Sequence, residues 1–182
     1  MLYILLANGF EEIEALATVD IIRRANIDIK TVGVGSDYIT GSHNITVKTD
    51  INIEDVALDD NIDGVILPGG IPGTPNLEAS DLAMKLLNFA YKKEKLVASI
   101  CAAPSIFGHK GILKGVKATC YPGFEKELKD AVVSEDYCVT DENVITAKGA
   151  GASFEFAFAI VNYILKETNS SKKLGEAMQC LR

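Results

Sequence analysis

Cys101 stands where a thiol could act as a nucleophile. The stretch LVASICAAPSIF predicts a buried strand over residues 96–100, and Pro104 is placed to open a helix. Small residues flank the cysteine at the spacing of the G-x-S-x-G nucleophile elbow, in which a tight turn lifts one side chain above a sheet. We expect the dipole of the following helix to lower the pKa of the thiol.

Two glycines could supply the groups that stabilise an oxyanion. The stretch VILPGGIPGTPNL predicts a strand over residues 64–67, and Gly69 and Gly70 follow its end. Their backbone N–H groups, with that of Ala102, are suited to holding negative charge on a substrate oxygen. A Gly/Pro-rich turn without chemistry is the alternative, and the lack of G-K-[ST] argues against a nucleotide-binding P-loop.

Three glutamates crowd into the stretch NGFEEIEALA, which follows the first predicted strand. Glu11 and Glu12 are explained as acidic residues favoured in the first turn of a helix. Glu14 shares a helical stripe with Thr18 and Ile21 that could face the sheet, and burial would raise the pKa of its carboxyl. A protonated Glu14 could donate a hydrogen bond to a cysteine thiolate or shuttle protons. Helical phase alone leaves open which of these glutamates is buried.

A histidine base for Cys101 is not evident in the sequence, which has only His43 and His109. His109 lies eight residues after the cysteine, about 12 Å along the axis of a continuing helix, so it is poorly placed to act as a base. His43 lies in the loop-like segment TGSHN and could reach a site only through tertiary or dimer contacts. We interpret both as surface residues.

The remaining cysteines predict neither a metal site nor a disulfide framework. They are widely spaced, and the chain contains no C-x-x-C pair. We expect them to be free thiols that mostly fill the core; they are Cys120, Cys138 and Cys180. No metal and no cofactor is predicted.

The elements that must position these residues alternate along the chain. Apolar runs predict strands at residues 2–7, 29–34, 45–49, 64–67, 96–100, 118–120, 137–140 and 144–146. Helical patterns cover residues 11–25, 82–91, 153–166 and 172–180, and a further helix starts over 104–108. This alternation predicts an α/β/α sandwich with a mostly parallel sheet, formed by a single domain over residues 1–182. Ligands bind such folds at the carboxyl ends of the strands, where the three candidate segments converge.

Composition narrows the class of partner. The chain has 182 residues, of which 48% are hydrophobic and 24% are charged, and its net charge is −7. This acidic balance argues against a nucleic-acid or anionic-membrane surface and leaves small molecules and other proteins. No apolar run reaches the roughly 18 residues of a membrane span. The first residues lack the basic region of a signal peptide, so we expect a cytoplasmic protein.

Four motifs together resemble the ThiJ/PfpI superfamily, in the branch of the human Parkinsonism-associated protein and its bacterial relatives. They are EEIEA, LPGG, ICAAP and KGAGASFEFAFAIV, and the resemblance runs essentially end to end. It implies a flavodoxin-like domain that forms a homodimer. It also implies that Cys101 is the nucleophile and redox-sensitive thiol, that Glu14 is the acid paired with it, and that Gly69, Gly70 and Ala102 line the site.

The resemblance implies two functions, which the sequence leaves open. One is enzymatic: glutathione-independent conversion of methylglyoxal to lactate, or repair of early glycation adducts on proteins. The other is a redox-sensing or chaperone-like stress protein whose cysteine is oxidised to a sulfinic acid without turnover.

Three positions depart from the patterns of relatives. Ala102 replaces the histidine of peptidase-like members, which argues against a protease. Tyr121, in TCYP, replaces a histidine of the human protein, and His43 replaces an arginine of the human branch. Tyr121 and His43 are therefore possible substrate contacts.

Overall fold

A seven-stranded sheet forms the centre of the computed structural model, which describes residues 1–167 and 170–180. All neighbouring strands run parallel except the pair at one edge, where β10 is antiparallel to β11. In spatial order the strands are β10 (Cys138–Asp141), β11 (Val144–Ala147), β7 (Leu96–Ile100), β6 (Gly64–Leu67), β1 (Leu2–Leu6), β2 (Ile29–Gly33) and β5 (Ile51–Asn52).

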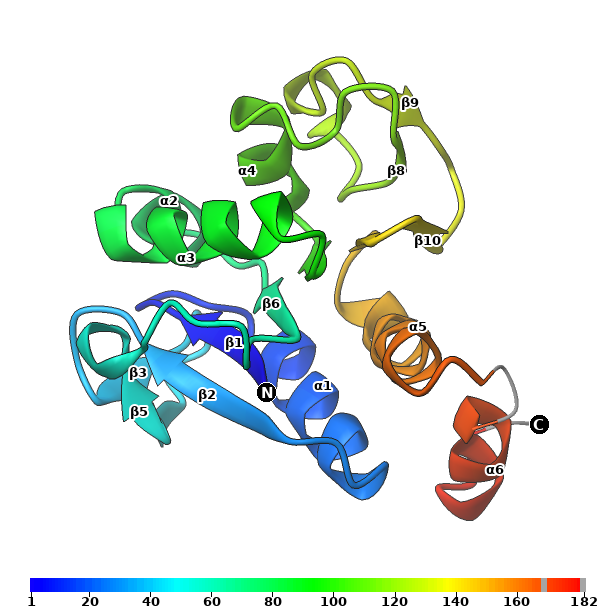
Figure 1. Cartoon of the computed structure of the whole chain (residues 1–182), viewed down its shortest axis with the longest axis horizontal. Coiled ribbons are helices and arrows are strands. Elements are labelled where there is room, and N and C mark those ends of the chain that lie inside the picture. The colour runs from blue at the N-terminus through cyan, green and yellow to red at the C-terminus, as the bar shows by residue number, and fades with distance from the viewer. Residues whose placement is uncertain (168–169, 181–182) are drawn as a thin grey trace.

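Helices cover both faces of this sheet (Figure 1). One face carries α1 (Glu12–Arg24), α5 (Ser153–Leu165) and α6 (Ser170–Ala177). The other carries α2 (Gly73–Glu78), α3 (Asp81–Lys92) and α4 (Pro104–His109). The arrangement is a flavodoxin-like α/β/α sandwich, which confirms the predicted fold class.

The pattern of apolar residues explains why these elements form and how they pack. In β1 successive side chains point to opposite faces, so Leu5 joins the core under α3 while Ile4 and Leu6 join the core under α1. β6 and β7 are buried along their whole lengths because helices cover both of their faces. The sheet therefore fixes the ends of β1, β6 and β7 beside one another.

The predicted strand over residues 45–49 does not join the central sheet, and the predicted strand over 118–120 is shorter. Thr46–Lys48 (β4) pairs with Tyr38–Thr40 (β3) in a separate hairpin. Lys117–Ala118 (β8) pairs with Val132–Val133 (β9), so Cys120 lies outside the strand. The 3₁₀ helices, which were not predicted, are η1 (Ile53–Asp55), η2 (Glu125–Glu127) and η3 (Ala150–Ala152).

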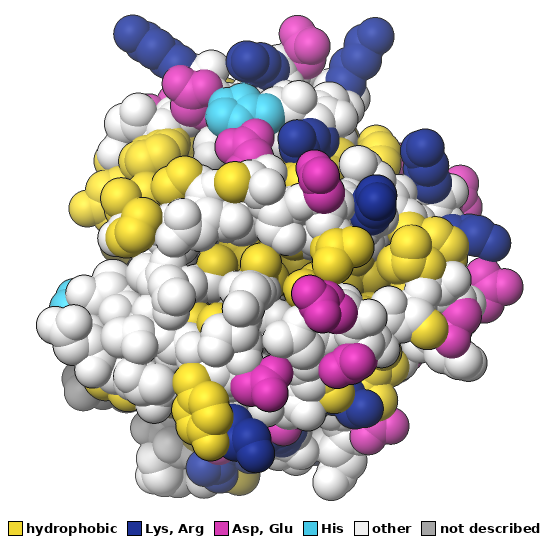
Figure 2. Space-filling model, turned by 90° about the vertical axis from the view of Figure 1, so that its left-hand side faces the viewer, with side chains coloured by type: hydrophobic (Ala, Val, Ile, Leu, Met, Phe, Trp, Pro, Cys, Tyr) yellow, Lys and Arg dark blue, Asp and Glu magenta, His cyan; other side chains and the backbone are white. Residues whose placement is uncertain are grey.

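The surface agrees with an acidic globular chain. On the face shown in Figure 2, acidic and basic side chains are interspersed with hydrophobic ones. Within the described residues, no helix is both long and apolar enough to cross a membrane.

The prediction that the other cysteines fill the core is wrong for Cys180, which is exposed; Cys120 is buried and Cys138 half-buried.

His109 joins three elements next to the candidate site. Its Nδ1 lies 2.8 Å from Glu78 Oε1 in α2, and its Nε2 lies 3.0 Å from Glu127 Oε2 in η2. Only a protonated imidazole can donate hydrogen bonds from both nitrogens. The hydrogen bonds to Glu127 and Glu78 accordingly raise the pKa of His109 above its ordinary value of 6.5.

We predict that His109→Asn lowers the free energy of unfolding on the order of 1 kcal/mol at about pH 5.5, and by less at about pH 8.5. Because the pKa of His109 is higher in the folded than in the unfolded state, its contribution is complete below about 6.5 and is lost as the pH rises through the folded value. Urea unfolding at both pH values measures the difference. An equal loss of free energy of unfolding at both pH values would contradict the interaction of a protonated His109 with Glu78 and Glu127.

Candidate active site

Cys101 lies on a sharp turn directly after β7. Its φ is +66°, in the left-handed region that side chains other than glycine rarely adopt. The backbone is held at both ends, because the Cys101 N–H donates to the Ala147 oxygen at 2.9 Å and its carbonyl accepts from the Tyr121 N–H at 2.8 Å. This geometry confirms the predicted elbow: the surrounding chain holds a strained residue in place.

The sulfur lies among backbone donors and close to Glu14. The backbone N–H groups of Ala102 and Gly70 act to lower the pKa of the thiol. Burial and the Glu14 carboxylate nevertheless raise the pKa of the Cys101 thiol to about 12. The prediction of a lowered pKa is therefore wrong, because burial and the nearby Glu14 carboxylate outweigh the backbone N–H groups that favour the thiolate.

Glu14 is the more deeply buried of the two buried glutamates in this stretch, Glu12 being the other. Its side chain is 1% exposed, and Oε2 accepts a hydrogen bond of 2.8 Å from the Gly69 N–H. Oε1 is also buried and accepts no hydrogen bond from any described residue. Burial raises the pKa of the carboxyl to about 7, although the contacts with Gly69 and Cys101 oppose the shift. This confirms the raised pKa that was expected for Glu14.

These two pKa values describe one proton shared by two groups. With Glu14 ionised, the thiol keeps its proton, because a second negative charge in the same dry space is costly. A thiolate becomes accessible once Glu14 carries the proton, and Oε1 is free to hold it. The pair can therefore move a proton between sulfur and carboxyl without bringing in water.

Gly69 allows the carboxyl and the thiol to approach each other. A methyl group at this position would lie 2.6 Å from Cys101 Cβ and 2.7 Å from Glu14 Oε2. The Gly69 N–H, which was expected to hold an oxyanion, is engaged with Glu14 instead. Gly70 and Ala102 remain as the candidate oxyanion donors.

Tyr121 lies beside the cysteine, as expected of a possible substrate contact. A methyl group at Gly149 would lie 3.2 Å from the Tyr121 ring and 3.9 Å from Cys101 Sγ, so Gly149 keeps the space next to the sulfur open. Gly149 and Ala147, whose carbonyl holds the Cys101 N–H, are functional residues that were not predicted. Gly149 lies in the motif KGAGASFEFAFAIV, which directly follows Ala147.

His43 pairs with a different glutamate. Its Nδ1 lies 2.9 Å from Glu12 Oε2, and its N–H donates to Glu12 Oε1 at 2.7 Å. Burial alone would raise the pKa of Glu12, but the hydrogen bonds from His43 and Ile45 lower it to about 2. Glu12 is therefore buried and paired, in addition to being an acid at the helix start. A methyl group at Gly41 would collide with its carboxyl.

Glu11, Glu12 and His43 are the described residues whose ligand atoms gather closely enough for a metal ion, within 4.8 Å of one another. The hydrogen bond to Glu12, and the charges of Glu11 and Glu12, raise the pKa of His43. Both carboxylates favour the charged imidazole, and we interpret the cluster as an ion pair of His43 with Glu12 that has Glu11 close by.

Comparison with known proteins places this geometry in a family. The sequence pattern of the DJ-1/PfpI family matches residues 1–163. The chain belongs to the DJ-1/PfpI family. This DJ-1/PfpI protein is 34% identical to protein dj-1beta of Drosophila melanogaster, over 86% of its own length and 85% of the relative's. It is 29% identical to a Caenorhabditis elegans protein named glutathione-independent glyoxalase, over 90% of its own length and 88% of the relative's.

Solved structures show the same fold. A DJ-1 superfamily protein of Salmonella typhimurium superposes with a TM-score of 0.93 at 30% identity, covering 98% of this chain and 97% of that one. Toxoplasma gondii DJ-1 in an oxidized form gives a TM-score of 0.93 at 26% identity, covering 100% and 98%. The predicted resemblance is thereby confirmed.

We predict that Gly69→Ala lowers the free energy of unfolding by about 1–3 kcal/mol, because the added methyl group overlaps Cys101 and Glu14. Gly151→Ala is the matched control, since a methyl group there meets no atom within 4 Å. Urea unfolding of both variants measures the effect. Equal stability of the two variants would mean that the carboxyl and thiol do not approach as closely as described.

We predict that Glu14→Gln raises the free energy of unfolding more at about pH 8 than at about pH 5, by up to about 3 kcal/mol. The pKa of Glu14 rises from 4.5 to about 7 on folding, so the folded state binds this proton more tightly and loses stability as pH rises between the two values. Glutamine keeps the shape and removes the titration. Urea unfolding of both proteins between about pH 5 and pH 8 measures the effect. Wild type and variant whose free energies of unfolding change in parallel with pH would contradict the raised pKa of Glu14.

Proposed function

We propose that this protein is a cysteine-dependent, glutathione-independent glyoxalase or deglycase that acts on methylglyoxal-like α-oxoaldehydes or early glycation adducts. One observation carries the proposal: the dry Glu14 carboxyl, with its free Oε1, lies against the thiol of Cys101. The relative named glutathione-independent glyoxalase supports it.

In the first step the Cys101 sulfur adds to the aldehyde carbon of the substrate. A carbon–sulfur bond forms, the carbonyl π bond opens, and the thiol proton passes through Glu14 to the new oxygen, giving a hemithioacetal. The N–H groups of Gly70 and Ala102 stabilise the negative charge that develops. Tyr121 borders the space that the substrate would fill and can donate a hydrogen bond to it.

In the second step Glu14 moves a proton between two substrate carbons. Its carboxylate removes the proton from the former aldehyde carbon and returns a proton to the neighbouring carbon. The proton of the new hydroxyl passes to the neighbouring ketone oxygen, so the hemithioacetal becomes the thioester of a 2-hydroxy acid. Water then hydrolyses the thioester, and the sulfur regains its proton. The complete reaction consumes one water molecule, and with methylglyoxal as substrate it yields lactate without an external reductant or oxidant.

A redox function of the same site is the second candidate. The N–H groups of Gly70 and Ala102, together with a protonated Glu14, could hydrogen-bond the oxygens of a sulfinate on Cys101. One of the similar structures is named as an oxidized form, which favours keeping this candidate. The two functions are compatible, because both depend on the same thiol and carboxyl.

We predict that the purified protein converts methylglyoxal to lactate without glutathione, and that Cys101→Ala and Glu14→Gln each abolish the conversion. Glu176→Gln, a change of an exposed carboxylate in α6, is the matched control and should keep full activity. Turnover surviving in either site variant would overturn the scheme. An inactive wild type in which peroxide adds two oxygens selectively to Cys101, by mass spectrometry, would favour the redox function instead.

We also propose that the protein forms a homodimer through the exposed side of α1. Ile13 and Leu16 are apolar and exposed there, and Ile45 lies next to them because its N–H donates to Glu12. We predict that wild type sediments with twice the mass of one chain and that Leu16→Glu shifts it to the monomer, whereas Val132→Glu does not. A monomeric wild type would contradict the proposal.

A further inference from the structure

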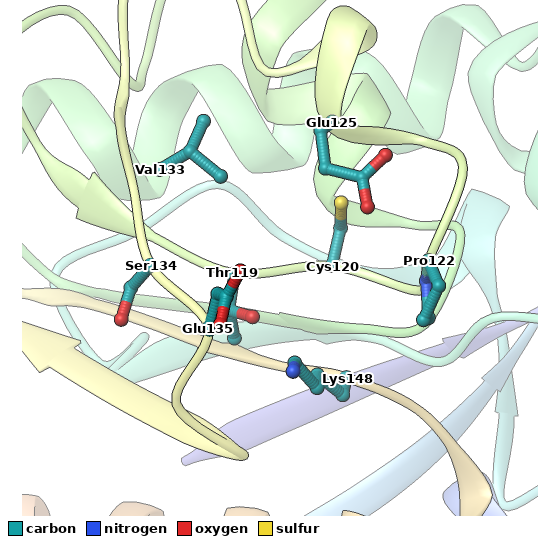
Figure 3. A pocket seen from close by; sticks show the side chains of 8 residues that line it. All are labelled: Thr119, Cys120, Pro122, Glu125, Val133, Ser134, Glu135 and Lys148. Atoms are coloured by element: carbon teal, nitrogen blue, oxygen red, sulfur yellow. The ribbon is translucent and has the colours of Figure 1, made fainter.

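A cavity lies beside the elbow. Its volume is about 340 Å³, within the range of small-molecule sites. The lining comes from residues 119–125, the segment after β9, and the end of β11 (Figure 3). Its members are Thr119, Cys120, Pro122, Glu125, Val133, Ser134, Glu135 and Lys148. None of them belongs to the pair of Glu14 and Cys101.

The hydroxyl of Thr119 lacks a partner in this cavity. Thr119 is only 1% exposed, and its Oγ1 makes no hydrogen bond with any described residue. A buried hydroxyl without a hydrogen bond lowers the stability of the folded chain. A polar group of a ligand in the cavity would satisfy it.

Of the charged groups in the lining, Glu125 is already engaged, because its Oε2 accepts a hydrogen bond of 2.8 Å from the Gly123 N–H, whereas Lys148 forms no ion pair with a described residue. No carboxylate oxygen of the described residues lies within 4.0 Å of the Lys148 ammonium, which instead lies 5.7 Å from the centre of the Tyr137 ring. In Figure 3, Lys148 and Glu125 lie at opposite ends of the cavity, with Cys120 between them. Glu135 adds a second carboxylate, so the lining carries one positive and two negative groups.

We propose that this cavity binds a free α-amino acid with a cationic side chain. The ligand carboxylate pairs with Lys148 and accepts a hydrogen bond from the Thr119 hydroxyl, while its two ammonium groups pair with Glu125 and Glu135. A ligand with one carboxylate and two ammonium groups neutralises all three charges of the lining. An acidic ligand would leave a carboxylate opposite another, and a diamine would leave Lys148 without a counter-charge.

The cavity is joined to the elbow through the backbone. The residues that hold the Cys101 N–H and carbonyl, Ala147 and Tyr121, are the immediate neighbours of Lys148 and Cys120. The binding residues are nevertheless separate from the proposed chemistry, so the inference does not depend on the proposed function.

Isothermal titration calorimetry with L-lysine tests the proposal. We expect wild type to bind L-lysine. L-Lysinamide, which lacks the carboxylate, and L-norleucine, which lacks the side-chain ammonium, should each bind at least about tenfold more weakly than L-lysine. Cys101→Ser should bind L-lysine as wild type does, which separates this cavity from the catalytic pair. Binding lost in Cys101→Ser would place the ligand in the other site and overturn the proposal.

Two substitutions test the contacts. Lys148→Met should weaken L-lysine binding about tenfold or more, whereas Lys126→Met, at an exposed lysine outside the cavity, should leave it unchanged. Thr119→Val should weaken binding severalfold while the free protein unfolds at the same or a higher temperature, because it removes an unpartnered hydroxyl. L-lysine that binds wild type, Lys148→Met and Thr119→Val equally, or that does not bind wild type at all, would overturn the proposal.

Discussion

The contact between the Glu14 carboxyl and the Cys101 thiol is the constraint on which the rest of the site depends. Glu14 is buried and Cys101 is half-buried, and the closeness of the two groups opposes the ionisation of both at the same time. Their approach requires the ends of three strands, β1, β6 and β7, to lie side by side, and the parallel sheet achieves this. The fold therefore supplies the chemistry by bringing together residues that are far apart in the sequence.

Holding this pair lowers the stability of the chain. Cys101 adopts a backbone conformation that is unfavourable for a residue with a side chain, and the ionised Glu14 is buried with one oxygen that accepts no hydrogen bond from the described residues. Neither feature helps folding, and the surrounding apolar core on both faces of the sheet must compensate for them. Features that oppose stability, gathered at one point, are what a site kept for function is expected to show.

Much of this could be predicted from the sequence, for physical reasons. The bounds of β6 and β7 were predicted because these strands are apolar throughout and end at a Pro-Gly segment and at the elbow. Glu14, Gly70, Cys101 and Ala102 were placed together because parallel strands share one carboxyl edge. The helical stripe made burial of Glu14, and with it a raised pKa, one possibility, and the packing of α1 against the sheet decides it.

The rest depends on packing, which local sequence does not encode. The direction of the Cys101 pKa is set by burial and by the distance to Glu14, and neither can be read from a helix dipole. The pairing of Glu12 with His43 joins residues 31 positions apart. Short elements such as β5, β8 and β9 have two residues each, too few to show a periodic pattern. The cavity at Thr119 likewise arises only when three separate segments meet.

The central claim, that Glu14 holds a proton near neutral pH beside Cys101, is tested most directly by infrared difference spectroscopy. The account predicts a carbonyl stretch from a protonated carboxyl that is present at about pH 6, disappears as the pH rises through about 7, and is missing from Glu14→Gln. A wild-type spectrum without that band at about pH 6, or a band that persists unchanged in Glu14→Gln, would contradict it.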